Sequence, residues 1–161
     1  METYPEPEGT DPFHRQPYIA SFEAVNGNYD AVLMVIHMDT DEATEEINAL
    51  DDVLYYSQSV YADEEDFIIM GDFDADGSYF DEDSTSDLDE YTWVIDDSID
   101  TTTKSTDYTY DGIVLTDSAD FTGEAGVFRY NLEYGLDEEL TTDVSDHYPV
   151  YAEFWVDGDL E

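Results

Sequence analysis

The stretch D-F-I-I-M-G-D-F-D-A-D-G at residues 66–77 places the strongest constraint on how this chain can fold. Residues 67–70 are a short apolar run, which is typical of a strand buried on both faces. Gly71 ends the run, and Asp72, Asp74 and Asp76 follow it. A buried strand that delivers carboxylates at its C-terminal end is a rigid support for a hard-cation site. In a chain with 44 acidic residues such clusters also arise by chance, so both interpretations stay open at this point.

The charge of the chain predicts the medium in which it folds. The formal net charge over 161 residues is −41, and Arg15, Lys104 and Arg129 are the only Lys and Arg residues. In dilute buffer this self-repulsion should destabilise the compact state, whereas at molar salt the Debye length falls to roughly 3 Å and screens it. An acidic interaction tail is the alternative, but here the acids interleave with strand-like runs along the whole chain. We therefore predict a halophilic protein.

Composition excludes several other classes. Hydrophobic residues make up 41% and aromatic residues 15% of the chain, too much apolar material for a disordered protein. The absence of Cys excludes disulfides, thiolate metal ligands and a Cys nucleophile. No apolar run approaches the roughly 20 residues of a membrane span, and the start of the chain lacks a signal-peptide pattern. We expect a soluble protein of unknown destination with no membrane partner, secreted if the natural chain is longer.

Hydrophobic periodicity predicts a mixed α and β protein. Alternating apolar residues indicate strands at 17–24 and 29–37, and Asn26-Gly27 between them is the strongest hairpin signal in the chain. A helix is expected over 41–61, with Thr40 as its N-cap, followed by the strand at 67–70. Further strands are expected at 91–95, 110–115, 127–130 and 148–156, with connections at 81–89, 96–107 and 137–140.

These elements define a fold class and a domain organisation. We predict an α+β or α/β sandwich whose mostly antiparallel mixed sheet carries a flanking helix. Residues 15–157 should form a single domain and residues 158–161 a tail. Residues 1–14 are rich in proline and acids, so we expect a disordered or loosely held lead-in.

Polar side chains lie at several of the predicted strand ends. His37 ends one strand, Asp111 begins another, and Asp146-His147 precedes the last. Strand ends at one edge of a sheet converge, which is where active sites form. A histidine oriented by an aspartate can move a proton, and carboxylates with Mg²⁺ can polarise a phosphoryl oxygen. The residues therefore favour metal-assisted hydrolysis of a phosphate ester.

Three motifs carry a resemblance to a known family. G-D-F-D-A-D at 71–76, Y-D-G-I-V at 110–114 and S-D-H-Y-P-V at 145–150 resemble the C-terminal half of the pancreatic-type deoxyribonucleases, in the endonuclease/exonuclease/phosphatase superfamily. V-I-H at 35–37 and the helical stretch at 43–53 resemble the same family, so the likeness covers residues 15–156. It implies part of a four-layer deoxyribonuclease I-like fold and a DNA-hydrolysing endonuclease that uses Mg²⁺ or Mn²⁺.

The resemblance also implies roles for single residues. His147 matches the histidine that acts at the scissile phosphate, Asp111 matches the aspartate that holds it, and His37 matches the second active-site histidine. Asp72 matches the aspartate that orients the attacking water or the metal, and Asp74 stands where the family has a phosphate-contacting asparagine.

Two metal sites follow from the same resemblance. The catalytic metal would be held by Asp146 and Asp72. A structural Ca²⁺ would be bound by the Thr-rich loop, through Asp100, Thr102 and Thr106, although Lys104 intrudes on that pattern.

The chain also departs from the family pattern. Asp74 adds a charge that favours a metal over direct contact with the substrate phosphate, and Gly112 replaces an arginine. Gly77 and Tyr108 stand where secreted relatives carry a disulfide. The N-terminal half of the family is missing, so a second chain supplying that half is an expected partner.

Two other interpretations stay open. One is a catalytically silent relative, and the other is a calcium-binding acidic module. The module is suggested by Asp72-x-Asp74-x-Asp76-Gly77, which matches the start of a calcium loop. That pattern requires Glu at its twelfth position, where this chain has Asp83, and a helix where we predict a strand.

Overall fold

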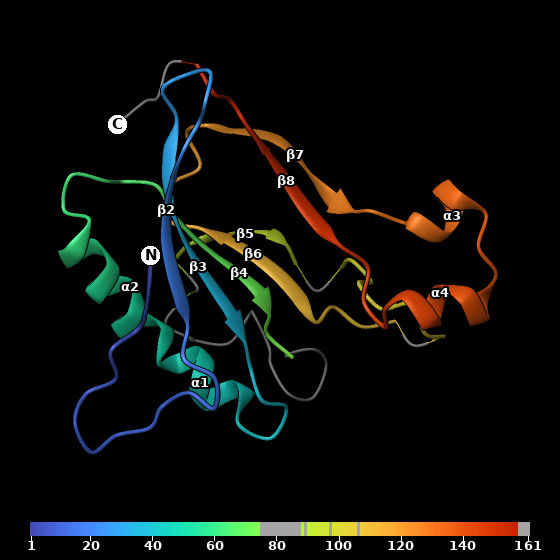
Figure 1. Cartoon of the computed structure of the whole chain (residues 1–161), viewed down its shortest axis with the longest axis horizontal. Coiled ribbons are helices and arrows are strands. Elements are labelled where there is room, and N and C mark those ends of the chain that lie inside the picture. Colours follow the sequence, from blue (N-terminus) through green and yellow to red (C-terminus); the bar gives the residue numbers. More distant parts are fainter. Residues whose placement is uncertain (75–87, 89, 97, 106, 158–161) are drawn as a thin grey trace.

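The computed structural model describes residues 1–74, 88, 90–96, 98–105 and 107–157, and eight strands and four helices lie within them (Figure 1). The larger sheet has the strand order β1-β2-β3-β4-β6-β5, with β3 and β4 parallel and every other neighbouring pair antiparallel. A second, antiparallel sheet consists of β7 and β8. The strand bounds are β1 Glu2–Thr3, β2 Tyr18–Glu23, β3 Asp30–His37, β4 Phe67–Asp72, β5 Thr92–Ile95, β6 Asp111–Leu115, β7 Phe121–Val127 and β8 Val150–Phe154.

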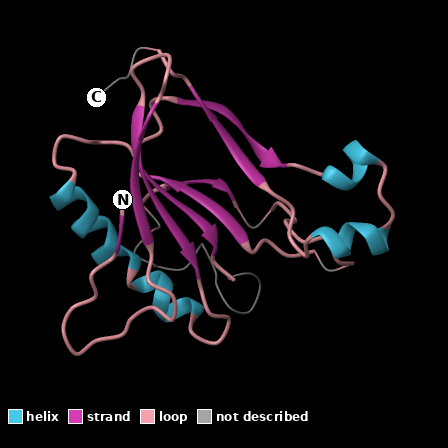
Figure 2. Cartoon of the chain, viewed as in Figure 1, coloured by secondary structure: helices cyan, strands magenta, loops and turns pink. Residues whose placement is uncertain are grey.

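One face of the large sheet is covered by helices. Helix α1 (Ala43–Asn48) and helix α2 (Leu50–Val60) connect β3 to β4 and pack against one side of the sheet (Figure 2). Val32 and Met34 of β3 and Ile69 of β4 point to this side and are fully buried, together with Ile47 and Leu50 of the helices. The predicted strand-helix-strand unit is confirmed, and so is the burial of β4 on both faces, since Phe67, Ile68 and Ile69 are all buried.

The opposite face of the large sheet is covered less completely. The cluster on this side contains five buried residues, and ten partly buried hydrophobic residues pack against it, in the part of the chain that the structure describes. Leu33 of β3 and Met70 of β4 are among the partly buried ones, and they face Val150, Ala152 and Phe154 of β8. A groove of about 450 Å³ remains between the large sheet and β8.

The start of the chain is more ordered than we expected for residues 1–14. Glu2 and Thr3 pair with β2, and the rings of Tyr4 and Phe13 are buried against each other at 5.9 Å between centroids. Glu46 of α1, 1% exposed, accepts a hydrogen bond from the His14 N–H at 2.8 Å and so ties this segment to the helix. The content of proline and acidic residues predicted disorder. The segment is ordered because Tyr4 packs against Phe13 and against Tyr56, which is far away in the sequence.

The helices also differ from the expectation. The helix expected over 41–61 is interrupted at Ala49, whose ψ of −6° departs from the regular α-helical value, and Thr40 does not cap it. β7 ends at Val127, the first residue of the strand expected at 127–130, and α3 (Tyr130–Tyr134) follows it. The connection expected at 137–140 instead contains the start of α4 (Glu138–Val144). No helix in the described ranges is both long and apolar enough to cross a bilayer. Residues 75–87, with the calcium-loop positions Asp76, Gly77 and Asp83, and the tail at 158–161 lie outside the described residues.

Candidate active site

The register of the large sheet brings three predicted site residues to one edge. His37 ends β3 and Asp72 ends β4, and the two are partners in the parallel pair. Asp72 is in turn the partner of Asp111, which begins the antiparallel β6. Gly71 makes this arrangement possible, because it has a φ of 138° and a Cβ there would lie 2.1 Å from the carbonyl oxygen of Ile36.

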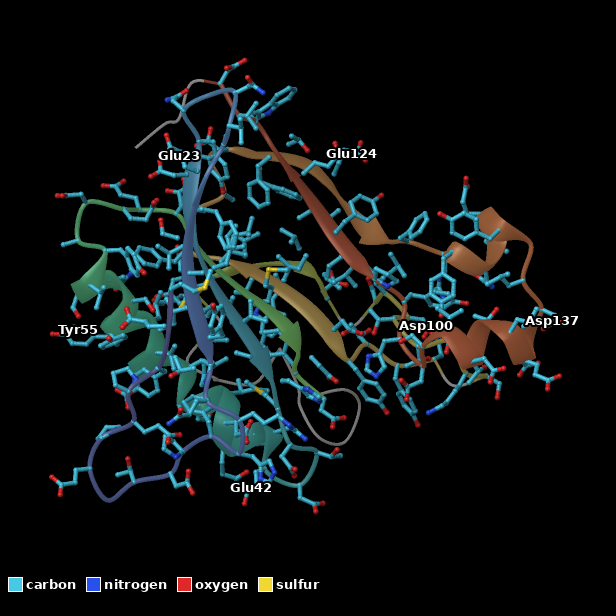
Figure 3. The ribbon with its side chains drawn as sticks, viewed as in Figure 1. Glu23, Glu42, Tyr55, Asp100, Glu124 and Asp137 are labelled. Carbon is cyan, nitrogen blue, oxygen red and sulfur yellow. The ribbon has the colours of Figure 1, made fainter. Side chains whose placement is uncertain are left out.

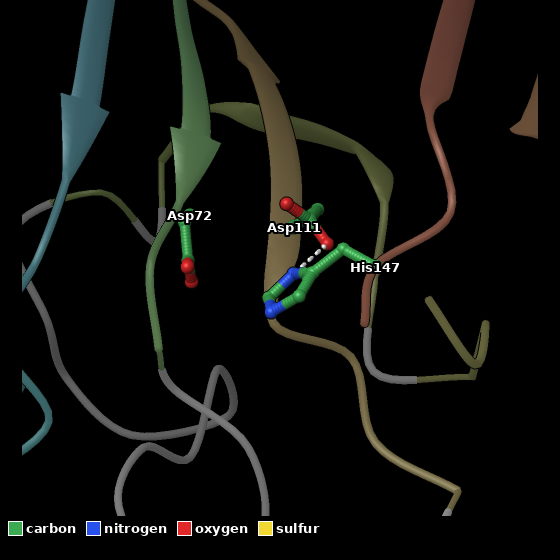
Figure 4. A group of neighbouring side chains, drawn as sticks. All are labelled: Asp72, Asp111 and His147. Carbon is green, nitrogen blue, oxygen red and sulfur yellow. Dashed lines mark hydrogen bonds and ion pairs between the residues drawn. The ribbon is translucent and has the colours of Figure 1, made fainter. Parts of the chain in front are cut away.

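His147 joins this edge from the segment that leads into β8 (Figure 4). Its Nδ1 lies 2.8 Å from Oδ2 of Asp111, a hydrogen-bonded ion pair. Asp72, Asp111 and His147 each offer an atom, and these atoms all lie within 4.8 Å of one another. Two carboxylates and an imidazole, all partly buried, therefore share one small volume.

The environment shifts the protonation of two members of this cluster. The hydrogen bond to Asp111, with the charges of Asp111, Asp72 and Asp146, raises the pKa of His147 to about 9, although burial opposes this. Burial raises the pKa of Asp72 above its ordinary value, and the charges of Asp111 and Asp74 add to this effect. At neutral pH His147 is therefore an imidazolium, and the carboxylates around it carry more negative charge than it neutralises.

His37 and Asp74 lie beside the cluster. Nε2 of His37 is 3.8 Å from Oδ2 of Asp72, and the His37 side chain is 61% exposed. The Asp74 N–H donates to Oδ1 of Asp72 at 2.9 Å, and Asp74 itself has a φ of 46°. The Asp74 carboxylate accepts a hydrogen bond from the hydroxyl of Thr40. Both residues are thus placed to extend the site along the ends of β3 and β4.

Asp146, the second predicted metal ligand, has a different partner. Its Oδ2 lies 3.2 Å from Nζ of Lys104, and both side chains are more than half exposed. The hydrogen bond from Lys104 lowers the pKa of Asp146. The structure therefore places Asp146 next to His147 in the chain but pairs its carboxylate with an ammonium group.

The predicted calcium loop is held by an arginine. Oδ1 of Asp100 accepts hydrogen bonds from the Thr102 N–H at 2.9 Å and from its hydroxyl at 2.8 Å. Oδ2 of Asp100 lies 3.3 Å from both Nη1 and Nη2 of Arg129. Each oxygen of this carboxylate thus already accepts two hydrogen bonds, so Asp100 does not fit the role of a calcium ligand. Thr106 lies outside the described residues.

Several residues that support the site were not singled out from the sequence. The hydroxyl of Thr101 accepts hydrogen bonds from the main-chain N–H groups of Tyr110 and Asp111, at 3.0 and 3.2 Å. The Thr103 hydroxyl donates to the carbonyl of Ser145 at 2.8 Å. The T-T-T run at 101–103 was the available signal, since buried threonines need hydrogen-bond partners.

Gly112, where the resemblance implied an arginine, is packed too closely for a side chain here. A Cβ at Gly112 would lie 2.7 Å from Cε2 of Phe73 and 3.2 Å from the Trp93 ring. The Phe73 and Trp93 rings lie 5.0 Å apart and occupy the space that a side chain at 112 would need. This departure from the family pattern is therefore coupled to local packing.

The few cations of the chain lie around the site. Arg15 donates to the main-chain carbonyls of His37 and Met38 at 3.3 and 3.2 Å. Lys104 pairs with Asp146, and Arg129 pairs with Asp100. The acidic side chains spread much more widely, as the outward-pointing Glu42, Glu124 and Asp137 show (Figure 3). All three permanent cations thus contact residues within or next to the candidate site.

Comparison with known proteins identifies the relatives of the chain. It is 36% identical to deoxyribonuclease-1 of Ovis aries over 152 residues, which cover 88% of this chain and 58% of the relative. The chain is a homologue of deoxyribonuclease-1. It is 38% identical to deoxyribonuclease-1 of Mus musculus, covering 90% and 54%, and 36% identical to deoxyribonuclease gamma of Rattus norvegicus, covering 88% and 49%. The chain thus spans about half the length of these curated relatives. No protein-family model matches the sequence.

Solved structures agree on the fold. A mannosyl-6-phosphatase of Bacteroides thetaiotaomicron superposes with a TM-score of 0.61 at 14% identity, covering 89% of this chain and 58% of that protein. An endonuclease/exonuclease/phosphatase family protein of the same organism gives a TM-score of 0.55 at 15% identity, covering 87% and 56%. The predicted deoxyribonuclease I-like architecture is confirmed by this likeness. At such identities the likeness concerns the fold alone.

Proposed function

We propose that this protein is a metal-dependent phosphodiesterase that hydrolyses DNA as an endonuclease. The observation that carries the proposal is the Asp72–Asp111–His147 cluster in a homologue of deoxyribonuclease-1. The relatives do not favour the alternative of a silent calcium-binding module. The chain covers little more than half of those relatives, so nicking of DNA by this chain alone is the decisive experiment.

The protonation of His147 indicates its role at the phosphate. Its Nδ1 is engaged by Asp111, which leaves Nε2 as the ring atom directed to a substrate. With a pKa of about 9 the ring carries a proton at neutral pH. His147 would therefore stabilise negative charge developing on the phosphoryl group and donate a proton to the leaving oxygen. Asp111 would fix the orientation of the ring and keep the proton on Nδ1 once Nε2 has donated its own.

Asp72 is the residue best suited to the water and the metal. Its carboxylate lies in a region with surplus negative charge, which a divalent cation would relieve. Mg²⁺ or Mn²⁺ bound there would polarise a phosphoryl oxygen. Asp74, from the same strand end, would contribute a second carboxylate to the metal or to its water shell. Asp146 can join only if its ion pair with Lys104 opens. His37, beside Asp72, would contact the phosphate from the β3 side.

A second chain that completes the sheet sandwich is the partner we propose. The groove between the large sheet and β8 is lined by apolar side chains, among them Ala31, Leu33, Ile68 and Ala152. The solved structures that share this fold are longer, since the chain covers 56–60% of them. Additional strands supplied by a second chain would cover this groove and the partly buried hydrophobic residues that line it.

The genomic sequence upstream of the Met1 codon tests this partner. We expect it to encode, in frame or as a neighbouring gene, a stretch similar to the unmatched part of deoxyribonuclease-1. Co-expression of the two parts should give a complex that Ala152→Glu in the groove prevents. Leu132→Glu, the same type of change at a 77% exposed position of α3, should leave the complex intact. A complex that tolerates Ala152→Glu equally well would refute the docking site.

Plasmid nicking tests the proposed activity. Supercoiled DNA at molar KCl with Mg²⁺ or Mn²⁺ should become nicked, and His147→Ala should abolish this. His14→Ala, the same change at a histidine outside the cluster, should leave the rate unchanged. The rates of cleavage of supercoiled plasmid DNA and of single-stranded RNA, measured under the same conditions, would give the preference between DNA and RNA. No nicking with either metal, or equal nicking by His147→Ala, would refute catalysis by this chain alone.

A further inference from the structure

Arg129 is the centre of a compact arrangement next to the site. It immediately precedes α3, and its Nη2 donates to the main-chain carbonyl of Asp100 at 2.7 Å. The guanidinium also contacts the Asp100 carboxylate through both terminal nitrogens and lies 4.5 Å from the ring centroid of Tyr148. One side chain thus makes two kinds of contact with the Thr-rich loop and stacks on a residue adjacent to His147.

The loop that Arg129 holds contacts the main chain at Asp111 and at residues 147–148. The Thr101 carbonyl accepts from the Tyr148 N–H at 2.7 Å, and the Thr101 hydroxyl accepts from the Asp111 N–H at 3.2 Å. Thr102 forms a β-bridge with His147. The separation between His147 and Asp111 is therefore set in part by residues 101 and 102, whose position depends on Asp100.

A calcium ion would compete with this arrangement rather than add to it. Ca²⁺ requires six to eight oxygen ligands, of which carboxylates are the strongest. Both oxygens of Asp100 and its main-chain carbonyl already accept hydrogen bonds from Arg129 or Thr102. A divalent ion at Asp100 would also lie next to a guanidinium that cannot lose its charge. Asp100, the carboxylate expected to bind calcium, thus has a permanent internal cation as its partner.

We propose that the Arg129 guanidinium replaces a structural calcium ion in the Thr-rich loop and acts as a positioning residue for His147. The loop conformation is then fixed by the chain itself. It needs no Ca²⁺ and is not changed by a chelator. The nicking assay for the positioning role rests on the proposed function. The calcium claim does not depend on catalysis.

The calcium claim is tested on the wild-type protein. Thermal unfolding at molar KCl should give the same midpoint with added CaCl₂ and with EGTA. In Arg129→Met, which keeps an unbranched side chain but removes its charge, the midpoint should fall, and CaCl₂ should recover part of the loss because Oδ2 and the main-chain carbonyl of Asp100 are released. A wild-type midpoint that rises with CaCl₂, and that Asp100→Asn makes insensitive to it, would overturn the replacement.

The positioning claim needs a spectroscopic readout. Arg129→Met should shift the low-field Nδ1 proton resonance of His147 and lower the nicking rate by roughly tenfold or more. Arg129→Lys, which keeps the charge, should restore part of both. Lys104→Met, which removes a different cation from the same loop, should leave the Nδ1 resonance in place. An unchanged His147 resonance in Arg129→Met would overturn the positioning role.

The outcomes separate this inference from the proposed function. If the wild-type protein fails to nick DNA with every metal tested, the proposed function fails. The midpoint and resonance measurements still decide the role of Arg129. If Arg129→Met does not fold, the wild-type calcium titration and the Arg129→Lys resonance decide it.

Discussion

Replacing Asp111 by Asn should lower the pKa of His147 and remove stability in a defined pH range. The Asp111 carboxylate accounts for the largest contribution that raises the pKa of His147 to about 9, through its hydrogen bond and its charge. An asparagine at this position has nearly the same shape and can still accept a hydrogen bond from Nδ1, but it carries no charge. The substitution therefore removes the charge of the partner with little change in packing.

The magnitude follows from the two pKa values. The difference between the ordinary value of 6.5 and about 9 corresponds to about 3 kcal/mol of preference for the protonated ring in the folded state. Because the hydrogen bond remains and Asp72 still attracts the ring, we expect Asp111→Asn to lose about 2 kcal/mol of this. A raised folded-state pKa contributes its full stability below 6.5 and loses it as the pH rises through about 9. The variant should therefore be least stable, relative to wild type, near about pH 6 and equal to it near about pH 10.

Two measurements at molar KCl check this prediction. The imidazole carbon-bound proton of His147 should titrate about 1.5 pH units lower in Asp111→Asn, and denaturant unfolding at several pH values should show the deficit shrinking as the pH rises. Asp157→Asn makes the same chemical change beyond the opposite end of β8 and should alter neither result. A His147 titration that stays near that of the wild type in Asp111→Asn would refute the assignment of its pKa to this ion pair.

Two further predictions concern the whole fold. Far-UV circular dichroism should show the chain gaining structure as KCl is raised to molar concentration, because screening removes the repulsion among its carboxylates; a fully folded spectrum in dilute buffer would contradict halophilic adaptation. Gly112→Ala should lower stability by about 1–3 kcal/mol, because its Cβ would lie 2.7 Å from Cε2 of Phe73; an unchanged thermal midpoint would show that Phe73 and Trp93 move aside freely.

The sequence allowed most of the large sheet to be predicted because its determinants are local. Alternating apolar residues predicted β2 and β3, Asn26-Gly27 predicted their hairpin, and a continuous apolar run predicted the central β4. The meeting of Asp72, Asp111 and His147 was expected from the position of each at a strand end. The strand register agrees with this expectation, because it places Asp72 between His37 and Asp111.

The elements that were missed depend on contacts between distant residues. The ordering of the N-terminal segment requires the ring of Tyr4 to pack on Phe13 and Tyr56, 5.9 and 5.7 Å away, which no local pattern indicates. Helix α4 begins at an Asp137 N-cap, whose side chain accepts from the Leu140 N–H, inside an acidic stretch that looked like a loop. The role of Arg129 could not be read from the sequence, because its partner Asp100 lies 29 positions away.

The placement of the three permanent cations has a consequence for how a polyanion would approach. Arg15, Lys104 and Arg129 all contact groups within or next to the site, so the permanent positive side-chain charges lie near it. At molar salt, fields fade within roughly 3 Å, so this asymmetry cannot guide DNA from a distance. It can act only after collision, by holding a phosphate that lands beside a cation for longer than one that lands among the carboxylates elsewhere. In such a medium the site would discriminate between binding positions through the residence time of the phosphate and not through its encounter rate.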